Sequence, residues 1–556
     1  MTNQTPTGPG NRVEVLVVGA GPTGLALAAQ LAAGGVRPRL IDRGADRARE
    51  SRALAIQPRT LEVLAGLRIT DQLVKHGNPA VRLRVHARGR VLAVPMFDLG
   101  LDDTAYPHML FLSQAETERI LEQHLTAAGI TVERRVELVD LTRTADAVIA
   151  RLRHHHGGGK ENVAAQYVVG CDGAGSTVRR LANIAFRGGS YPQTFVLADT
   201  EADGIEPDAA HVWLTGTGML FFFPLVHPSS WRMLMMRPPA DPTPPHAPLE
   251  LAEVQTIADA HTGGSVRLHD PLWMTNFRLH HRAATSYRAG RVFLAGDAAH
   301  IHSPAGAQGM NTGIQDAVNL AWKLAHTIHS GRQQPDMLDT YQLERAPIGA
   351  AVLRFTDRAF TIATSTNPIL RLTRTRLAPA LIRVALTSRT GRRYAFRTVS
   401  QLCIRYRHSP LSAEGPQAPR HGPHAGDRLP DAVLTYDGQP TTLHGALAAP
   451  TWHLLLCGRS GAWPTGHLAR LTSDHPAQLE VHHLTTQDTP GALHDPQGQA
   501  LHRLGLTADQ TAHYLIRPDG HIGYRNSGTD LTRLDRYLHV WLPRPSGATT
   551  PDPATP

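Results

Sequence analysis

The stretch GAGPTG at residues 19–24 decides the fold of the first part of this 556-residue chain. It follows a mainly apolar stretch over 13–18, typical of a buried parallel strand, and precedes a mainly apolar stretch over 25–33, typical of a helix. In such a unit the glycines permit a tight turn, backbone approach to a pyrophosphate and close helix–strand packing, at Gly19, Gly21 and Gly24 respectively. The helix N-terminus favours an anionic ligand. The stretch therefore predicts a βαβ unit that binds a dinucleotide.

An acidic residue ends the next predicted strand, RLID at 39–42. Asp42 follows the glycine run by about 20 residues, where a carboxylate accepts hydrogen bonds from an adenosine ribose. A carboxylate at this place suits an unphosphorylated ribose. A glycine turn that merely links a strand to a helix would not explain this acid.

Two acidic signatures far along the chain complete the nucleotide site: GCDG at 170–173 and AGDAAH at 295–300. With the first glycine run they indicate bound FAD. A second glycine run, GAQGMNTG at 306–313, leads into a helix predicted from near Asn311. Its apolar face consists of Ile314, Ala317, Val318, Ala321 and Leu324. The N–H groups and dipole of this helix favour negative charge at the flavin pyrimidine edge, although an ordinary loop and helix cap is the alternative interpretation.

These motifs together resemble the group A flavoprotein monooxygenases, the para-hydroxybenzoate hydroxylase-like family of aromatic hydroxylases. The resemblance spans roughly residues 12–400 and includes, besides the glycine runs and Asp42, the residues Asp172, Gly173, Ser176, Arg179, Gly296, Asp297, His300 and Pro304. The part after about residue 425 resembles the thioredoxin-like tail of the aromatic polyketide hydroxylases and phenol hydroxylases.

The resemblance implies a set of residues that contact non-covalent FAD: Gly19, Gly21, Gly24, Asp42, Arg52, Gln114, Asp172, Gly173, Gly296, Asp297, Gly309, Met310 and Asn311. No histidine or cysteine pattern for covalent attachment is present. The resemblance places Pro304 between the flavin ring and the substrate. His300 and His302 are candidates to polarise or deprotonate a group, or they are structural hydrogen bonders. No side-chain nucleophile is required.

The implied reaction is a hydroxylation. NADPH or NADH reduces FAD, O2 adds to form a C4a-hydroperoxide, and its distal oxygen passes to an electron-rich phenol. The expected substrate is a polycyclic aromatic polyketide or related phenol, in antibiotic-type secondary metabolism. Baeyer–Villiger oxygenation and attack on a simple phenol or a rifamycin-like naphthohydroquinone stay open. Two alternatives belong to other classes, a non-oxygenating flavoprotein and a flavin-binding assembly partner.

Extended segments over 183–285 predict a sheet-based substrate domain. Strand alternation places Met219, Phe221 and Phe223 on one face, and Trp231, Met233 and Met235 on a single face of the next strand. Aromatic and methionine stripes usually pack in a core. The candidate substrate contacts Phe221, Phe223, Trp231, Met233 and Met235 therefore line either a ligand pocket or the core.

The expected fold class is α/β, with a Rossmann-like FAD-binding domain, an inserted β-sheet substrate domain and a C-terminal thioredoxin-like α/β domain. The predicted bounds are 12–182 and 286–408 for the FAD-binding domain with its following helices, 183–285 for the substrate domain, 409–424 for a linker, 425–545 for the thioredoxin-like domain and 546–556 for a disordered tail. The last domain lacks CxxC, because Cys457 is followed by GRS, so a dithiol redox cycle is excluded. We expect it to be structural or an oligomer contact, and homodimer formation is left open.

Composition limits the other classes of function. The 41% hydrophobic content is ordinary for a globular protein, and three cysteines without paired spacing fit a reducing cytoplasm. The net charge of +9 comes from scattered arginines, without the clustered patch of a nucleic-acid binder. The HHHGGG run at 154–159 predicts a hairpin turn, and we predict no metal site. No segment is apolar enough to suggest a membrane partner, so the expected partner is a small aromatic molecule.

Overall fold

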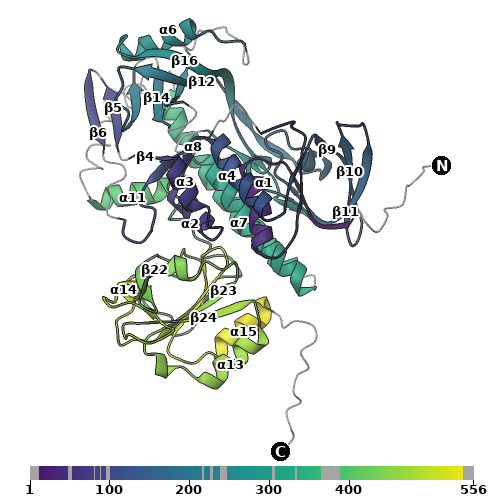
Figure 1. The fold of residues 1–556 in the computed structure, drawn as a ribbon, viewed down its shortest axis with the longest axis vertical. Helices are drawn as coiled ribbons and strands as arrows, with labels where there is room; N and C mark the ends of the chain where they lie inside the picture. Colours follow the sequence, from purple (N-terminus) through teal and green to yellow (C-terminus); the bar gives the residue numbers. More distant parts are fainter. Residues whose placement is uncertain are drawn as a thin grey trace, which may run out of the picture.

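The computed structural model describes residues 12–47, 53–80, 82–87, 89–94, 101–215, 218–225, 229–237, 247–303, 307–331, 335–364 and 389–542. Arg52, Pro304 and the predicted tail at 546–556 lie outside these residues. Figure 1 shows three parts along the long axis: a sheet with β12 and β16, a central part around α1 and α7, and a C-terminal part. The mixed α/β fold predicted from the sequence is confirmed.

The central part contains a mainly parallel sheet, because buried strands alternate with helices that cover it. Its order is β17 (Arg288–Ala289), β18 (Val292–Leu294), β11 (Lys160–Gly170), β1 (Arg12–Val18), β2 (Arg39–Asp42) and β8 (Val132–Arg134). Strand β10 (Val148–His154) pairs antiparallel with β11, and β9 (Val136–Arg143) pairs antiparallel with β10, so the two strands extend this sheet. Strands β10 and β11 form the predicted hairpin around 154–159. The predicted unit of β1, a helix and parallel β2 is present.

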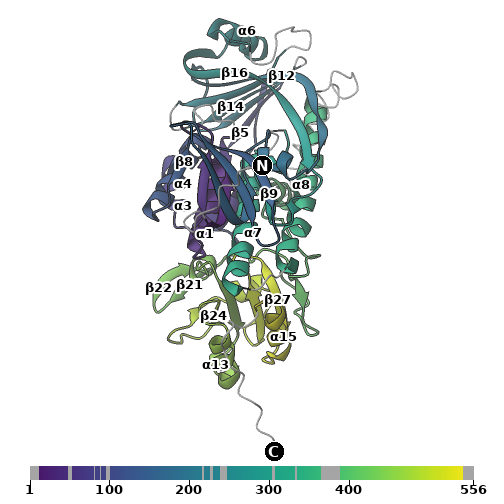
Figure 2. The same cartoon turned by 90° about the vertical axis from the view of Figure 1, so that its right-hand side faces the viewer.

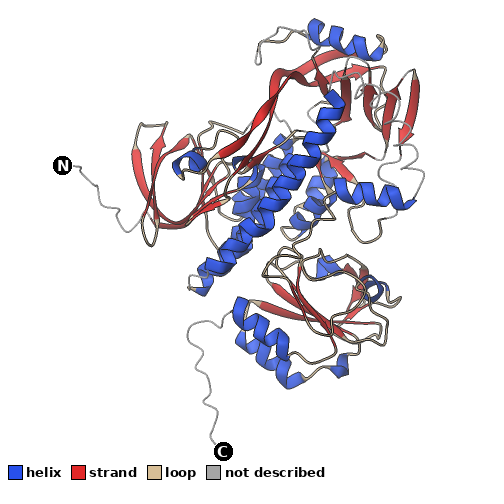
Figure 3. Cartoon of the chain, turned by 180° about the vertical axis from the view of Figure 1, so that it is seen from behind, coloured by secondary structure: helices blue, strands red, loops and turns tan. Residues whose placement is uncertain are grey.

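The helices of this part pack on the sheet and on one another. They are α1 (Pro22–Ala33), α2 (Pro58–Ala65), α3 (Thr70–His76), α4 (Gln114–Ala127), α5 (Thr177–Leu181), α7 (Gly309–Ser330), α8 (Pro335–Thr364) and α11 (Arg389–Val399). A small sheet of β3 (Ala55–Ile56), β7 (Met109–Phe111) and β4 (Asn78–Ala80) lies beside them. Figure 3 shows α7 and α8 as long helices through the middle of the molecule. Among the residues described, no helix has the length and apolar character needed to span a bilayer.

Helix α7 is buried on nearly all sides, whereas the sequence predicted one apolar face. Its buried residues include Asp316, Asn319 and Lys323 as well as the five predicted apolar positions. The C-terminal part covers a further face, where the rings of Trp322 and Trp452 meet edge to face at 5.5 Å between centroids. Polar residues on α7 are therefore buried together with partners, and a hydrophobic pattern does not reveal them.

The second sheet is mainly antiparallel and lies at one end of the molecule (Figure 2). Its order is β19 (His300–Ile301), β16 (Arg267–Ala284), β12 (Phe186–Asp203), β15 (Trp231–Met236), β14 (Met219–Pro224), β13 (Ala210–Leu214), β5 (Leu83–Ala87) and β6 (Arg90–Val94). Helix α6 (Leu251–Thr262) packs on one face. The predicted bounds 183–285 omit β5, β6 and β19. This is a correction, because β13 pairs in parallel with β5 and recruits the β5–β6 hairpin from the first part of the chain.

The C-terminal part is a separate α/β domain. Its sheet has the order β20 (Ala413–Glu414), β27 (Ile522–Ser527), β26 (Ala512–Ile516), β23 (Trp452–Cys457), β24 (Leu479–Thr485), β25 (Leu493–His494), β21 (Val433–Tyr436) and β22 (Gln439–Thr442). Its helices are α12 (Leu443–Ala446), α13 (Thr465–Asp474), α14 (Gln499–Arg503) and α15 (Thr532–Trp541). The parallel β23–α13–β24 unit and the antiparallel β26–β27 hairpin agree with the expected thioredoxin-like arrangement.

The predicted linker at 409–424 is not a free connection. Strand β20 pairs in parallel with β27, Leu411 is buried in the core, and Ser409 donates a hydrogen bond to Glu344 at 2.6 Å. This is a second correction, because a stretch rich in Pro, Gly and His contributes an edge strand. The composition of a segment does not report its hydrogen bonding.

Buried ion pairs dock the C-terminal domain onto the central part. Both terminal nitrogens of Arg517 contact the Glu344 carboxylate, at 2.7 and 2.8 Å, and Lys323 contacts it at 2.7 Å. Arg428 pairs with Glu62 at 2.5 Å. These side chains are almost fully inaccessible to water, so their charges depend on one another.

Candidate functional site

The first glycine turn leaves open space at one place only among its three glycines. A Cβ on Gly24 would lie 1.9 Å from the Gly19 carbonyl oxygen, and one on Gly19, where φ is +104°, would lie 2.4 Å from the Cys171 oxygen. A Cβ on Gly21 would meet nothing within 4 Å. Gly21 is the N-cap of α1, which has no side-chain cap and no acidic residue in its first turn. The turn thus fits the pyrophosphate of a dinucleotide.

Asp42 is fixed against this turn at the end of β2. One carboxylate oxygen accepts the Ala20 N–H at 2.7 Å, and the other accepts the Gly44 N–H at 2.6 Å. Each oxygen has a further lone pair, so the carboxylate can accept ribose hydroxyls as well. The predicted contact of Asp42 with the cofactor stays a prediction that this geometry supports.

Gln114 begins α4, where Ser113 caps the helix by accepting the Glu116 N–H at 3.2 Å. The Gln114 amide nitrogen donates to Glu118 at 2.8 Å. Burial raises the pKa of Glu118 to about 7, although this hydrogen bond opposes the shift. The sequence reasoning missed Glu118. Its spacing of four residues from Gln114, on one helix face, was the signal that could have found it.

The Asp172 carboxylate is used by the protein itself. It accepts the Ser176 hydroxyl at 2.5 Å and the N–H groups of Thr177 and Val178 at 2.6 and 3.1 Å, so it caps α5. Gly173 has φ of +75°, and a Cβ there would meet nothing within 4 Å. The open side of this loop is at Gly173, whereas Asp172 holds the loop in shape.

Arg179 joins the two acidic signatures, which are more than a hundred residues apart. Its guanidinium donates to the Ala298 and Ala174 carbonyls, each at 2.8 Å, and stacks 3.7 Å from the Phe186 ring centroid. The motifs at 170–173 and 295–300 therefore meet in space, as a common nucleotide site requires.

Asp316 of α7 holds the backbone of the turn that carries Asp297. Asp316 accepts the Gly296 N–H at 3.0 Å, His300 Nε2–H at 2.7 Å and Arg345 Nε–H at 2.7 Å. Burial alone would raise the pKa of Asp316, but His300 and Arg345 outweigh it and hold that pKa below its ordinary value. An ionised carboxylate accepts only, so His300 donates from Nε2.

The positions within the 295–300 turn differ in exposure. Gly296 and Ala298 are buried, whereas Asp297 is exposed, so the Asp297 side chain points away from the core. His300 is buried and bonded to Asp316. Of the two uses that the sequence left open for His300, the geometry shows the structural hydrogen bond.

Thr23 packs where the three glycine motifs converge. A Cβ on Gly296 would lie 2.5 Å from Thr23 Oγ1, and one on Gly313 would lie 2.4 Å from the same atom. Any larger residue at either glycine would separate α1, α7 and the Asp297 turn. Thr23 and Gly313 belong to the two glycine runs, but the sequence pattern did not predict their contact.

The start of α7 is held by the side chain of Asn311. Its oxygen accepts the Gln57 N–H at 2.8 Å, and its nitrogen donates to the Ala55 and Ala307 carbonyls at 2.8 Å each. The helix starts at Gly309 without a side-chain cap or an acidic residue in its first turn. The backbone around Gly309 and Met310 can therefore face a flavin, while the Asn311 side chain is committed to the protein.

His302 lies beside this helix start. Its Cε1 would be 3.5 Å from a Cβ on Gly309, and its ring stacks on that of His300 with centroids 5.8 Å apart. Burial, with a smaller contribution from His300, lowers the pKa of His302 to about 4. His302 is therefore neutral at pH 7 and supplies no positive charge.

The predicted substrate contacts lie on opposite faces of the second sheet. Trp231, Met233 and Met235 are at most 3% exposed and pack in the core beneath α6. Of the ligand pocket and the core, which the sequence left open for these three candidate substrate contacts, the structure shows the core, because helix α6 covers that face. Phe221 and Phe223 are half-buried on the other face. Phe223 packs with Phe111, at 5.8 Å between ring centroids, and belongs to the same cluster as Ala307.

Arg232, which the sequence reasoning missed, lies opposite Phe223 on the neighbouring strand. It pairs with both Asp199 oxygens at 2.6 Å and donates to the Ala53 carbonyl at 2.7 Å. Because Ala53 precedes β3, this fully buried arginine attaches the second sheet to the segment that Asn311 holds. A charged residue within the Met-rich strand was the available signal.

Comparisons with known proteins agree with this geometry. A family model described as "FAD binding domain" matches residues 12–356, and one described as "Aromatic-ring hydroxylase, C-terminal" matches residues 422–545. The chain is 36% identical over 546 residues to a 6-methylpretetramide 4-monooxygenase of Streptomyces rimosus, covering 95% of this chain and 94% of the relative. It is 33% identical over 552 residues to a rifampicin monooxygenase of Rhodococcus hoagii, covering 96% and 98%. The structure of the anhydrotetracycline hydroxylase OxyS from Streptomyces rimosus superimposes with a TM-score of 0.75 at 30% identity, covering 96% of this chain and all of that chain.

Proposed function

Because this chain belongs to the FAD-binding aromatic-ring hydroxylases, a family of FAD-dependent monooxygenases, we propose that it hydroxylates a polycyclic aromatic polyketide or related phenol with NADPH as reductant. The observation that carries this proposal is the similarity over almost the whole chain, substrate sheet included, to an enzyme named 6-methylpretetramide 4-monooxygenase. A pathway of antibiotic-type secondary metabolism is the setting that this substrate class implies.

The residues present fit FAD. Gly21 leaves the backbone open at the start of α1, Asp42 is oriented for a ribose, and the start of α7 is uncapped. Bound FAD supplies electron transfer from NADPH and activation of O2. The N-terminus of α7 favours negative charge on the group it faces, because its first N–H groups have no partner within the helix.

The aromatic face of the second sheet is the proposed substrate wall. Phe221 and Phe223 stack at 5.6 Å between ring centroids, on the face that meets Phe111 and Ala307. Flat apolar side chains of this kind bind a polycyclic aromatic and exclude water from the reacting atoms. The buried pair of Arg232 and Asp199 keeps this face in place relative to the start of α7. We assign no proton transfer to His300, since its Nε2–H is bonded to Asp316.

A second candidate substrate is a rifamycin-like naphthohydroquinone. The similarity to a rifampicin monooxygenase over nearly the whole chain favours it. Both candidates use the same flavin chemistry and differ in the ring system that the Phe221–Phe223 face must accept.

The test measures the rate at which NADPH reduces the enzyme-bound flavin anaerobically, with and without a panel of phenols. The readout is the loss of the oxidised flavin absorbance. The panel contains tetracyclic and angular polyketide phenols, a rifamycin-type naphthohydroquinone and simple phenols. We expect one polycyclic phenol to accelerate reduction at least about tenfold, and its product to gain one atom of 18O from 18O2 as a hydroxyl. If only simple phenols accelerate reduction, simple phenols are the substrate class instead of polycyclic ones. An oxygen inserted into a ring would indicate Baeyer–Villiger chemistry. Reduction without O2 consumption under every condition would overturn monooxygenation of these phenols.

A further inference from the structure

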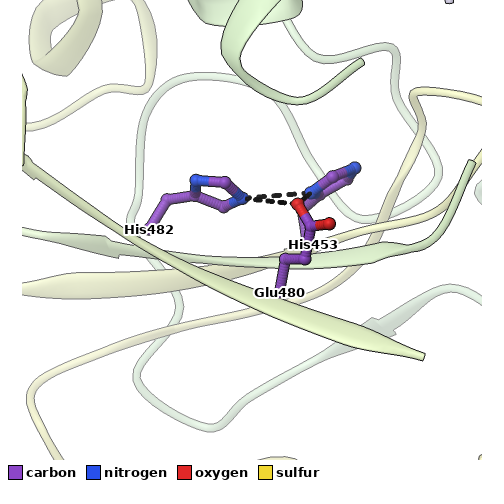
Figure 4. A group of neighbouring side chains, drawn as sticks. All are labelled: His453, Glu480 and His482. Atoms are coloured by element: carbon purple, nitrogen blue, oxygen red, sulfur yellow. Dashed lines mark hydrogen bonds and ion pairs between the residues drawn. The ribbon is translucent and has the colours of Figure 1, made fainter. Parts of the chain in front are cut away.

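Three metal-binding side chains converge in the C-terminal domain, away from the flavin site. His453 lies on β23, and Glu480 and His482 lie on the neighbouring parallel strand β24, two residues apart and hence on one face. His453 is directly opposite Glu480 in the register. Figure 4 shows the two imidazoles and the carboxylate directed at one another.

The spacing of the three ligand atoms matches a tetrahedral metal site. His453 Nδ1 lies 3.1 Å from His482 Nε2 and 3.4 Å from Glu480 Oε2, and His482 Nε2 lies 3.6 Å from Glu480 Oε2. Bonds of about 2.0–2.1 Å at tetrahedral angles separate ligand atoms by about 3.3 Å. One ion can therefore contact all three atoms with only small side-chain movements.

The protonation state of His453 also fits a ligand. Its Nε2 lies 3.0 Å from the Ala449 carbonyl oxygen, which only accepts, so Nε2 carries the hydrogen and the lone pair of Nδ1 faces His482 Nε2. A second ring nitrogen bonded to a backbone carbonyl is the usual outer partner of a metal-bound histidine.

One side of the cluster is open to solvent. His453 is 1% exposed and His482 is 18% exposed, whereas Glu480 is 49% exposed. Glu480 brings negative charge next to two neutral imidazoles, and the solvent side leaves room for a water as a fourth ligand.

We propose that His453, Glu480 and His482 bind one divalent transition-metal ion, for which Zn2+ is the best match. Two imidazoles and one carboxylate suit zinc better than Mg2+ or Ca2+, which prefer oxygen ligands alone. On binding, the hydrogen on His482 Nε2 moves to Nδ1, so the ring stays neutral and Nε2 becomes a ligand. The ion joins β23 to β24 and stabilises the C-terminal domain without taking part in flavin chemistry. The competing interpretation is a hydrogen bond between two neutral histidines and no ion.

The test uses the full-length, FAD-loaded protein and Zn2+ alone as the probe. The chain has 32 histidines, so weak surface sites are removed by competition with a weak chelator, and the remaining zinc is measured per chain. We expect one equivalent of tightly held Zn2+. Loss of an outer partner weakens metal binding about 10–100-fold, so His482→Gln, which removes a ligand, is expected to weaken it by at least about 100-fold.

His483→Gln is the matched control, because the adjacent residue on β24 points to the opposite face. It is expected to keep the zinc site. Zinc is also expected to raise the melting temperature of the wild type and of His483→Gln, but not of His482→Gln. Equal zinc retention in all three proteins, or no retained zinc in the wild type, would overturn the proposal.

A crystallographic measurement keeps the proposal testable if His482→Gln fails to fold. Wild-type crystals soaked in Zn2+ are measured on both sides of the zinc absorption edge. An anomalous peak about 2.0–2.2 Å from the three ligand atoms supports the site, and no peak there overturns it.

Discussion

Asp316→Asn is expected to destabilise the protein strongly and to weaken FAD binding. Asp316 is fully buried in α7 and accepts hydrogen bonds from Gly296 N, His300 Nε2 and Arg345 Nε. The amide keeps the shape of the carboxylate but loses its charge, and its nitrogen presents hydrogens to donors. The buried guanidinium of Arg345 then loses the carboxylate that pairs with it.

The magnitude follows from the burial of this pair. Removing one partner of a buried ion pair costs about 3–5 kcal/mol. At about 2–4 °C per kcal/mol for a large domain, the apoprotein should melt roughly 6–20 °C lower. Because Gly296 N is bonded to the same carboxylate, the turn that carries Asp297 should also lose its fixed position. FAD affinity should therefore fall by about tenfold or more, equivalent to about 1.4 kcal/mol.

The assay measures thermal unfolding of the apoprotein by circular dichroism and FAD affinity by the change in flavin fluorescence. Asp339→Asn is the matched control, because Asp339 pairs with Arg288 at the surface and is 59% exposed. Surface pairs contribute about 0–1 kcal/mol, so this variant should melt within about 2–4 °C of the wild type. If Asp316→Asn unfolds within the same margin and binds FAD with unchanged affinity, the assigned role of Asp316 is wrong.

Three further predictions compare single-residue variants with one another or with the wild type. Gly21→Ala should leave the apoprotein stable but weaken FAD binding, because the added methyl fills only the open side of the turn. Gly24→Ala should destabilise the apoprotein, because its methyl would collide with the Gly19 carbonyl oxygen. Equal melting temperatures for the two apoproteins would contradict this. The pKa of Glu118 is raised to about 7 from an unfolded value near 4.5, so its contribution to stability is complete below pH 4.5 and is lost as pH rises through 7. That contribution amounts to about 3 kcal/mol. The melting temperature of apo Glu118→Gln should therefore depend less on pH between pH 5 and 8 than that of the wild type. If both melting temperatures change equally with pH, the assignment is wrong. Met233→Ala should cost about 2–5 kcal/mol by leaving a cavity beneath α6. Phe223→Ala should instead mainly raise the KM for a polycyclic phenol. If Phe223→Ala lowers the melting temperature and Met233→Ala raises the KM, the assignment of the two faces as substrate wall and core is wrong.

The local chemistry of the flavin site could be read from the sequence because each motif acts through neighbouring residues. The strand, glycine turn and helix at 13–33 are adjacent in the chain, and Asp42 ends the next strand. Steric limits on Gly19 and Gly24 depend on the backbone path of such a unit, which is the same wherever it occurs. Sequence pattern also predicted the start of α7 and the hairpin around 154–159.

Contacts between distant segments were decided only by the tertiary structure. Phe223 packs against Phe111 of the central part and Phe221 shares its sheet face, while Trp231, Met233 and Met235 face α6. The register of two paired strands determines which alternating set shares a face. Alternation within one strand gives two sets and cannot say which is covered. The edge strand at 413–414 likewise depends on its pairing with β27.

The buried charges illustrate the same limit most clearly. In the sequence, Asp316, Arg345 and Arg517 are ordinary polar positions, because their side chains pair only after α7, α8 and the C-terminal domain are packed. The chain by itself determined the dinucleotide turn, the α/β class and the kind of cofactor, through local sterics and hydrogen bonding. The tertiary structure decided which charges are desolvated, which face of the second sheet meets the central part and which histidines converge, because those properties depend on segments brought together from far along the chain.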